Sequence, residues 1–403
     1  MTPALATTDR LPRVSSAAAA VLGLHLSISP SSLPHGAVLQ GVVSALFVLM
    51  CVQAARAVRR SPSRWTGPSR VVGLIAVGLL ATAVGMWGHH VLDAARTQAG
   101  LPSLDWRYWA TVLGVVAAGL LLRQAGMTAW RGTTWSRAVW RPVGAAVVCL
   151  GLVLAGGPAH GAGPDDTMWV MQQRSPVGAT RAYARILPDE GVEARAQRSV
   201  DALVRDGGLH RSRVVIVLPT GSGWVDPQFL AGLEDRFGAD VASVSMQYDA
   251  APSWWSFLVH RQRSADAART LFDEVTARID ALPPEERPDL HVYGESLGAD
   301  AGQALFAGEA GADARRAVCS VLWVGPPGGR RAGMDREGVV ANADDPIVHA
   351  SWRGLVLPAP DEEGWLPGVS GVHDAVDFVG ALDVPEGMGH RYGTDQVDSL
   401  AVC

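Results

Sequence analysis

The 403-residue sequence predicts an α-helical transmembrane domain over residues 1–160 and an α/β domain with a mostly parallel sheet over residues 161–403. Two observations support this division. Uncharged apolar segments recur before about residue 160, whereas most charged residues lie after it. Beyond residue 163, short β-branched segments alternate with segments of helical periodicity, a pattern typical of a parallel sheet covered by helices.

The N-terminal domain is expected to cross the membrane four or five times. Gly36–Ala55 is a stretch of 20 residues without a charge, about the length that a helix needs to span the hydrocarbon core. Further apolar segments follow at 71–87, 108–122 and 143–157. The weaker segment at 14–33 is expected to form either a fifth span or a re-entrant or interfacial piece. Buried core helices of a soluble protein are the alternative, and the charged loops between the segments argue against it.

The arginines in the loops predict the orientation of these spans. Residues 56–70 contain five arginines and residues 123–141 contain four, whereas the two arginines in residues 88–107 are balanced by Asp93 and Asp105. Arginine-rich loops face the cytoplasm. Five spans with a cytoplasmic N-terminus then place the α/β domain outside the cytoplasm.

Composition, charge and cysteine spacing argue against a nucleic-acid partner and against a bound metal. All 34 residues of the Lys and Arg class are arginine, and the net charge is −5 without any basic stretch that interleaves aromatic residues. Both features argue against a nucleic-acid partner. The cysteines show neither a disulfide framework nor the spacing of metal ligands, and we expect no metal and no cofactor. The four cysteines are Cys51, Cys149, Cys319 and Cys403.

The α/β domain can be divided into its elements by period and by turn residues. Apolar β-branched runs predict strands, and a segment of helical period that ends at Pro283-Pro284 predicts a long helix. The predicted strands are 213–220, 240–249, 289–294, 317–325 and 337–346, and the predicted helices are 256–282 and 297–308.

Ser296 is the candidate nucleophile. It lies in HVYGESLGADAG, where an apolar strand leads into the serine and a helix of small residues leads away. A tight strand-to-helix turn exposes the serine oxygen, and the flanking glycines allow the close backbone approach that this turn requires. The turn also places the Leu297 amide at a helix N-terminus, where it can stabilise an oxyanion. A plain turn without catalytic function is the alternative.

A nucleophilic serine needs a base, which should follow it in the chain. Three of the 11 histidines follow Ser296. His390 is favoured because it lies in the glycine-rich stretch EGMGHRYGTD near the chain end. His349 is close in sequence to the candidate acid, and His373 is expected at the start of a helix.

The acid that orients the base is predicted to be Asp345. It lies in NADDPIV, after a strand-like run and before a proline that ends regular structure. Asp344 is its competitor. Asp374 and Asp377 are expected on a solvated helix.

The second half of an oxyanion hole is expected from the loop that follows the strand at 213–220. An amide of Thr220, Gly221 or Ser222 in LPTGSGWVDP is the candidate donor. A phosphate-binding loop of the Walker type is excluded because the chain has no lysine. Trp254 and Trp255 are candidates for an apolar substrate entrance, with a packing role as the equal alternative.

The sequence also contains the stretches PTGSGWVDP, MQYDAAPSWWSFLV, YGESLGA, VGPP, DDPIV and GHRYGTD. Together they resemble the actinobacterial membrane-anchored α/β-hydrolase family, and Leu26–Val43 is similar to the opening of its multi-span N-terminal domain. The resemblance implies an α/β-hydrolase domain in which Ser296 is the nucleophile, with Asp345 and His390 completing the triad. The stretch after DDPIV is shorter than in that family, and His260 stands where an acid is expected.

The sequence therefore predicts a membrane-anchored serine hydrolase, esterase- or lipase-like or an acyltransferase, that acts through an acyl-enzyme on an ester or thioester. Its membrane anchor favours a lipid-linked or envelope substrate and contact with membrane lipid. A serine peptidase with the same triad is one alternative. A non-catalytic membrane scaffold or receptor with a degenerate hydrolase domain is the other, and an intact triad counts against it.

Overall fold

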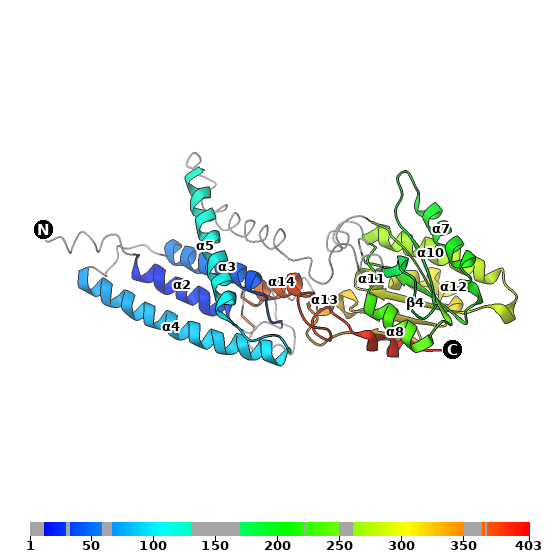
Figure 1. The fold of residues 1–403 in the computed structure, drawn as a ribbon. Coiled ribbons are helices and arrows are strands. Elements are labelled where there is room, and N and C mark those ends of the chain that lie inside the picture. Colours follow the sequence, from blue (N-terminus) through cyan, green and yellow to red (C-terminus); the bar gives the residue numbers. More distant parts are fainter. Residues whose placement is uncertain are drawn as a thin grey trace. The chain divides into compact units, whose positions relative to one another are not determined.

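The chain is divided into two compact units (Figure 1). The computed structural model describes residues 12–29, 33–58, 67–129, 170–220, 223–249, 261–349, 365–366 and 369–403. One unit, here called the helical unit, comprises Met1–Pro158 and Trp352–Pro385. The other, here called the α/β unit, comprises Ala159–Ser351 and Glu386–Cys403. Residues 352–385 thus interrupt the α/β unit, a feature that the sequence did not suggest.

The predicted apolar segments of the helical unit form helices wherever the structure describes them. The predicted segment at 143–157 lies outside the described residues. The helices of this unit are α2 (Val14–Ser27), α3 (Ala37–Ala57), α4 (Gly67–Gln98), α5 (Trp106–Ala129) and α14 (Ser370–Gly380).

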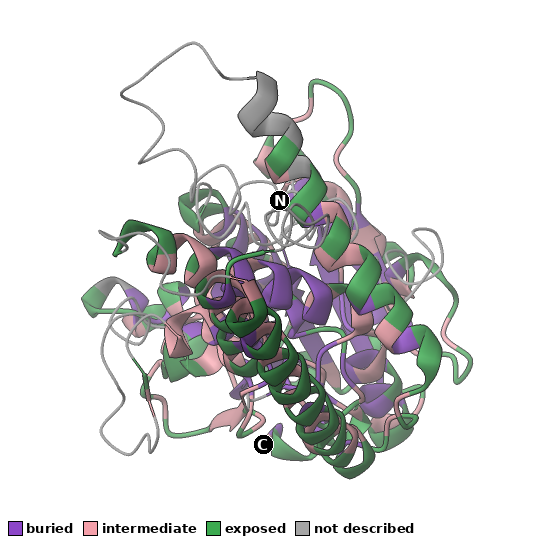
Figure 2. Cartoon of the chain, turned by 90° about the vertical axis from the view of Figure 1, so that its left-hand side faces the viewer, coloured by how far each residue is buried: buried purple, intermediate pink, exposed green. Residues whose placement is uncertain are grey.

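Two of these helices, α3 and α4, are long and apolar enough to cross a membrane, each with a mean hydropathy of 2.0 in its most apolar window. The two differ in burial, because 56% of that window is buried in α3 and 11% in α4. The exposed residues of these helices are coloured green in Figure 2. Exposed apolar side chains of α4 include Val72, Ile75 and Leu79. The prediction of four or five spans is thus supported at two helices, and the remaining spans stay a prediction.

Helix α14 packs against the N-terminal helices through buried polar contacts. His35 Nε2 donates to Asp377 Oδ1 at 2.6 Å, and His373 Nε2 donates to the Leu26 carbonyl at 2.9 Å. The His373 ring also stacks on Phe47. The expectation of a solvated helix is therefore wrong for Asp377, whose side chain is buried because it pairs with His35.

The α/β unit contains a six-stranded sheet and the helices that cover it. Its strands are β1 (Thr180–Ala184), β2 (Arg213–Leu218), β3 (Val241–Met246), β4 (Asp289–Glu295), β5 (Ser320–Val324) and β6 (Glu337–Val340). Its α-helices are α7 (Val192–Arg205), α8 (Pro227–Phe237), α10 (Arg261–Asp280), α11 (Leu297–Leu305), α12 (Ala312–Ala317) and α13 (Pro346–His349). Its 3₁₀ segments are η1 (Val170–Gln172), η2 (Gly208–His210), η3 (Pro284–Glu286), η4 (Glu309–Gly311), η5 (Pro327–Gly329) and η6 (Thr394–Ser399).

All neighbouring strands of the sheet pair in parallel, in the order β1-β3-β2-β4-β5-β6. The predicted parallel sheet is therefore confirmed. The chain builds the sheet to one side of β2 and then continues on the other side with β4. Ligands of open α/β sheets bind at such a switch point, outside the carboxyl ends of the strands. The carboxyl ends of β2 and β4 are thus the place to look for a site.

Alternating residues of the strands divide into two cores, one on each face of the sheet. Val214, Ile216 and Leu218 of β2 belong to a core with α7, α10 and α11, whereas Val215 and Val217 face α8. Figure 1 shows α7 and α10 on the side of the sheet opposite to α8. A central strand that is apolar on both faces is typical of a sheet covered by helices on both sides. This cover holds the loops at the carboxyl ends of the strands in fixed positions.

A disulfide joins Cys319, just before β5, to Cys403, with the two Cα atoms 5.9 Å apart. The sequence had suggested no disulfide, because the two cysteines are separated by 84 positions and only the fold brings them together. Next to this bond, Ser320 Oγ donates to the Ala401 carbonyl at 2.7 Å. The disulfide therefore fixes the C-terminal segment against the sheet.

Loss of this disulfide is expected to lower the free energy of unfolding by roughly 2–5 kcal/mol, because the bond restricts the unfolded chain. Thermal melting of Cys319→Ser against the wild-type chain measures the effect. Cys51→Ser is the control, since Cys51 is a free thiol. Equal melting of the wild type and Cys319→Ser would contradict a stabilising role for the bond.

Candidate active site

Ser296 lies in the sharp turn between β4 and α11, and its backbone is strained. Its φ of 52° and ψ of −118° are sparsely populated by residues with a side chain. Among the described residues, Asp189 is the other non-glycine residue with positive φ. The Ser296 amide donates to the Val324 carbonyl at the end of β5, at 2.9 Å. The neighbouring strand therefore helps to hold the strained turn in place.

The two glycines that flank Ser296 are required by sterics. A Cβ atom at Gly294 would lie 2.6 Å from the carbonyl group of Gly298. A Cβ atom at Gly298 would lie 2.1 Å from the Leu218 carbonyl oxygen. Both distances are far below van der Waals contact. The Gly-x-Ser-x-Gly pattern thus allows α11 to pack directly against the ends of β4 and β2.

The structure brings Asp345 and His390 together. His390 Nδ1 donates to Asp345 Oδ2 at 2.7 Å, across 45 residues of sequence. Asp345 is fully buried, and it accepts further hydrogen bonds from the Ile347 amide at 2.8 Å and from the Tyr392 hydroxyl. His390 Nε2 is buried and has no hydrogen-bond partner in the described part of the chain. With Nδ1 bound to the carboxylate, Nε2 is the nitrogen that can accept a proton.

The surroundings of Asp345 favour its charged form. Burial alone would raise the pKa of Asp345, but the hydrogen bonds and positive charge of His390, with Tyr392 and the Ile347 amide, lower this pKa below its usual value. The carboxylate therefore persists at neutral pH. A charged Asp345 can fix the tautomer of His390 and stabilise an imidazolium.

Gly325 links the serine turn to the imidazole. It directly follows Val324, whose carbonyl accepts the Ser296 amide. Gly325 has a φ of +52°, and a Cβ atom there would lie 2.4 Å from His390 Cε1 and 2.8 Å from Nδ1. The imidazole therefore packs on the Gly325 backbone, one residue after Val324, whose carbonyl accepts the Ser296 amide. Among the described residues no hydrogen bond joins His390 Nε2 to Ser296.

The predicted donors of an oxyanion hole differ in their availability. Leu297 is the first residue of α11, where a backbone amide has no acceptor within the helix. The Thr220 amide donates to the Trp224 carbonyl at 3.0 Å within its own turn. The prediction that the Thr220 amide can donate to an oxyanion is therefore wrong, because this amide already donates within its own turn. Gly221 and Ser222 lie outside the described residues.

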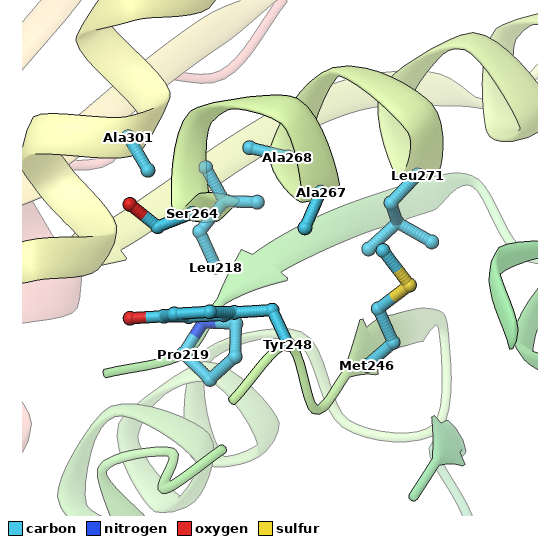
Figure 3. A pocket seen from close by; sticks show the side chains of 9 residues that line it. All are labelled: Leu218, Pro219, Met246, Tyr248, Ser264, Ala267, Ala268, Leu271 and Ala301. Carbon is cyan, nitrogen blue, oxygen red and sulfur yellow. The ribbon is translucent and has the colours of Figure 1, made fainter. Parts of the chain in front are cut away.

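A small apolar pocket lies beside the end of β2 and the start of the loop that follows it (Figure 3). Tyr248 and Ser264 direct their hydroxyl groups to the same end of it (Figure 3). The Tyr248 hydroxyl is buried without a hydrogen-bond partner among the residues that the structure describes. Trp254 and Trp255, the candidate substrate entrance, lie outside the described residues. The pocket is lined by Leu218, Pro219, Met246, Tyr248, Ser264, Ala267, Ala268, Leu271 and Ala301.

The alternative candidates for the acid and the base lie elsewhere in the structure or support the loop that carries His390. His349 is exposed and its Nε2 lies 3.0 Å from the Ala343 carbonyl. His373 belongs to the helical unit. Asp344 Oδ1 accepts the Gly389 amide at 3.0 Å, so it supports the loop that carries His390. Asp345 is thus the carboxylate that contacts the imidazole.

Sequence reasoning missed Gly325, Tyr392 and Asn342. Asn342 Nδ2 donates to the carbonyls of Gly389 and Arg391 at 2.9 and 3.0 Å, and so fixes the loop on both sides of His390. In the sequence, the position of Tyr392 two residues after the candidate base His390 was the one sign of a role in the site. No sequence pattern points to Gly325, because its role depends on contacts between distant segments.

One group of metal-binding residue types occurs among the described residues, at Asp289, His291 and Cys319. Cys319 Sγ is bonded to Cys403, however, and metals bind the free thiolate. Burial lowers the pKa of His291 to about 4. We therefore assign no metal to this group.

Comparison with known proteins finds a hydrolase domain in the α/β unit. Residues 180–349 match the sequence model of the Alpha/beta-hydrolase family. Ser296 and Asp345 lie within the matched range, and His390 lies beyond it. The match supports the predicted α/β-hydrolase domain and a hydrolase activity. No curated protein matches the chain.

Among solved structures, a cutinase from Trichoderma reesei in complex with a C11Y4 phosphonate inhibitor is similar to part of the chain. The alignment covers 47% of this chain and 85% of the cutinase chain, with 15% identity and a TM-score of 0.29. This likeness is too low to bear on the function.

Proposed function

We propose that the protein is a membrane-anchored serine hydrolase or acyltransferase that forms an acyl-enzyme from an ester or thioester. The observation that carries the proposal is the buried His390–Asp345 pair, which packs on Gly325 beside the strained turn of Ser296. A strained serine, a base and an orienting carboxylate are the three parts of a nucleophilic serine site.

In the proposed reaction, Ser296 Oγ attacks the acyl carbonyl carbon and gives its proton to His390 Nε2. Asp345 holds the imidazole through Nδ1 and stabilises the imidazolium. The Leu297 amide stabilises the oxyanion of the tetrahedral intermediate. His390 then protonates the leaving alcohol or thiol. Water or a second alcohol, deprotonated by His390, releases the acyl group and restores Ser296.

The anchor and the disulfide support an extracytoplasmic location for the α/β unit. The apolar helices α3 and α4 support a multi-pass anchor in membrane lipid. Disulfides persist in oxidising compartments and are rare in the cytosol, so the Cys319–Cys403 bond agrees with the orientation that the arginine-rich loops predict. An enzyme held there would meet lipid-linked or envelope substrates.

The detergent-solubilised full chain is expected to hydrolyse p-nitrophenyl esters, and Ser296→Ala is expected to lower kcat by about 10⁶-fold. Ser399→Ala is the matched control because it removes an exposed hydroxyl group. Addition of a long-chain alcohol distinguishes the two reactions: ester product indicates acyl transfer, and free acid indicates hydrolysis. Equal turnover by the wild type and Ser296→Ala would contradict the proposal, and a folded wild type without turnover would favour the scaffold.

A further inference from the structure

Four buried polar side chains form a hydrogen-bonded cluster beneath the serine turn. Glu295, Tyr293, Gln396 and Asp226 are 4%, 1%, 2% and 6% exposed. Glu295 directly precedes Ser296 at the end of β4, and Gln396 comes from η6 near the chain end. The proposed triad does not use any of these four groups.

The hydrogen bonds of Gln396 fix the orientation of its amide. Gln396 Nε2 lies 2.7 Å from Asp226 Oδ2 and 2.8 Å from the Gly393 carbonyl oxygen. Both partners are acceptors, so Nε2 uses its two protons there. A reversed amide would place three acceptor oxygens against one another. Gln396 Oε1 therefore faces the Tyr293 hydroxyl, at 2.9 Å.

This orientation determines where the proton of the Tyr293 hydroxyl goes. A phenol has one proton to donate, and Gln396 Oε1 can only accept it. The Tyr293 oxygen is also 3.3 Å from Glu295 Oε2. With the Tyr293 proton on the nearer Gln396 Oε1, the 3.3 Å contact is a hydrogen bond only when Glu295 supplies the proton. The buried cluster thus favours a carboxylic acid over a carboxylate at Glu295.

The electrostatic surroundings agree with this assignment. Burial, then the charges of Asp226 and Asp345, raise the pKa of Glu295 well above its usual value, against the lowering effect that a proton donated by Tyr293 has. Asp226 faces the cluster from the start of α8, and Tyr392 and His390 face Asp345 from the C-terminal loop. No arginine forms an ion pair with Glu295 among the described residues, so its charge would be uncompensated.

We propose that Glu295 is a positioning residue that stays protonated in the folded protein and, by donating to Tyr293, joins the end of β4 to the hydrogen bonds from Tyr293 through Gln396 to Asp226. The positioning role rests on the proposed function of Ser296, whereas the protonation state does not. Loss of the proton removes the donor and places a third carboxylate beside Asp226 and Asp345. The serine turn would then lose its support at alkaline pH.

The first test measures stability against pH. The folded protein holds a proton that the unfolded chain releases above the ordinary glutamate pKa of 4.5, so this proton stabilises the fold at acid pH and its contribution is lost as pH rises. Glu295→Gln keeps a donor for Tyr293 without this linkage. Its melting temperature relative to the wild type should therefore rise from about pH 5 to about pH 8. Glu286→Gln, at an exposed glutamate, should show a constant difference.

A constant difference for Glu295→Gln would overturn the proposal, because it would mean that Glu295 ionises as it does in the unfolded chain. Should Glu295→Gln fail to fold, infrared spectroscopy of the wild-type chain at neutral pH gives the same information. A carbonyl band of a protonated carboxylic acid that persists in Asp226→Asn supports the proposal, and its absence overturns it.

The second test measures the pH profile of ester turnover. The alkaline limb of kcat should lie at higher pH in Glu295→Gln than in the wild type, and Glu286→Gln should follow the wild type. Coincident limbs for Glu295→Gln and the wild type would overturn the positioning role. Failure of the proposed function gives a different result, since no variant would then turn over ester while the melting difference would still depend on pH.

Discussion

Asp345→Asn is expected to lower kcat/KM for ester hydrolysis by about 10⁴-fold while leaving the fold intact. The buried carboxylate accepts His390 Nδ1 at 2.7 Å, and an amide in its place can donate to the imidazole. The ring would then adopt the wrong tautomer, with its proton on Nε2 and no base facing Ser296. Steady-state kinetics and a thermal melt of the same preparation separate the loss of activity from a loss of structure.

Asp344→Asn is the matched control, one residue away. Asp344 Oδ1 accepts the Gly389 amide, and an asparagine oxygen can still accept it, so turnover should stay within about 10-fold of the wild type. A larger loss in Asp344→Asn than in Asp345→Asn would make Asp344 the orienting acid.

The effect of pH on stability has a definite sign, because the pKa of Asp345 is lowered. The stability that its carboxylate provides should be present above the ordinary pKa of 3.8 and be lost at lower pH.

Gly325→Ala is expected to lower kcat/KM by at least about 10²-fold, through displacement of the imidazole. The added methyl group would lie 2.4 Å from His390 Cε1. Either the ring leaves Asp345 or the end of β5 moves, and that strand end holds the Ser296 amide. Turnover and the pH profile of kcat/KM measure the loss of a correctly placed base.

Gly333→Ala controls for backbone strain in this prediction. Gly333 also has a positive φ, of +75°, but a Cβ atom there meets nothing within 4 Å. Both variants carry the cost of positive φ, and only Gly325→Ala crowds the imidazole. Equal activities for the two variants would show that the contact of Gly325 with His390 does not position the base.

Local patterns in the sequence predicted much of this fold and site. Apolar β-branched runs predicted β2, β3 and β5, because a strand buried on both faces needs such residues. Chain order left three histidines after Ser296, and the glycine-rich stretch around His390 and the strand-like run before Asp345 predicted which histidine and which acid would meet. Each of these inferences depends on a short stretch or on chain order, and both are visible in the sequence.

Other features depend on contacts that the sequence does not encode locally. Gly325 acquires its role only where β5 meets the His390 loop. Thr220 lost its predicted role because its amide is used within its own turn. The sequence predicts a solvated helix for Asp377, yet this residue is buried against His35 from the distant N-terminal part. The Cys319–Cys403 disulfide likewise required the fold to bring both ends together.

The most direct test of the central claim is covalent labelling of the full-length protein in membranes with a fluorophosphonate probe. An activated serine attacks the phosphorus and keeps the probe, so peptide mapping should find the label on Ser296. Ser296→Ala should not be labelled, and Asp345→Asn should be labelled much more slowly than the wild type. Labelling that persists in Ser296→Ala, or a folded wild-type protein that does not react, would contradict the assignment of Ser296 as a nucleophile activated by His390 and Asp345.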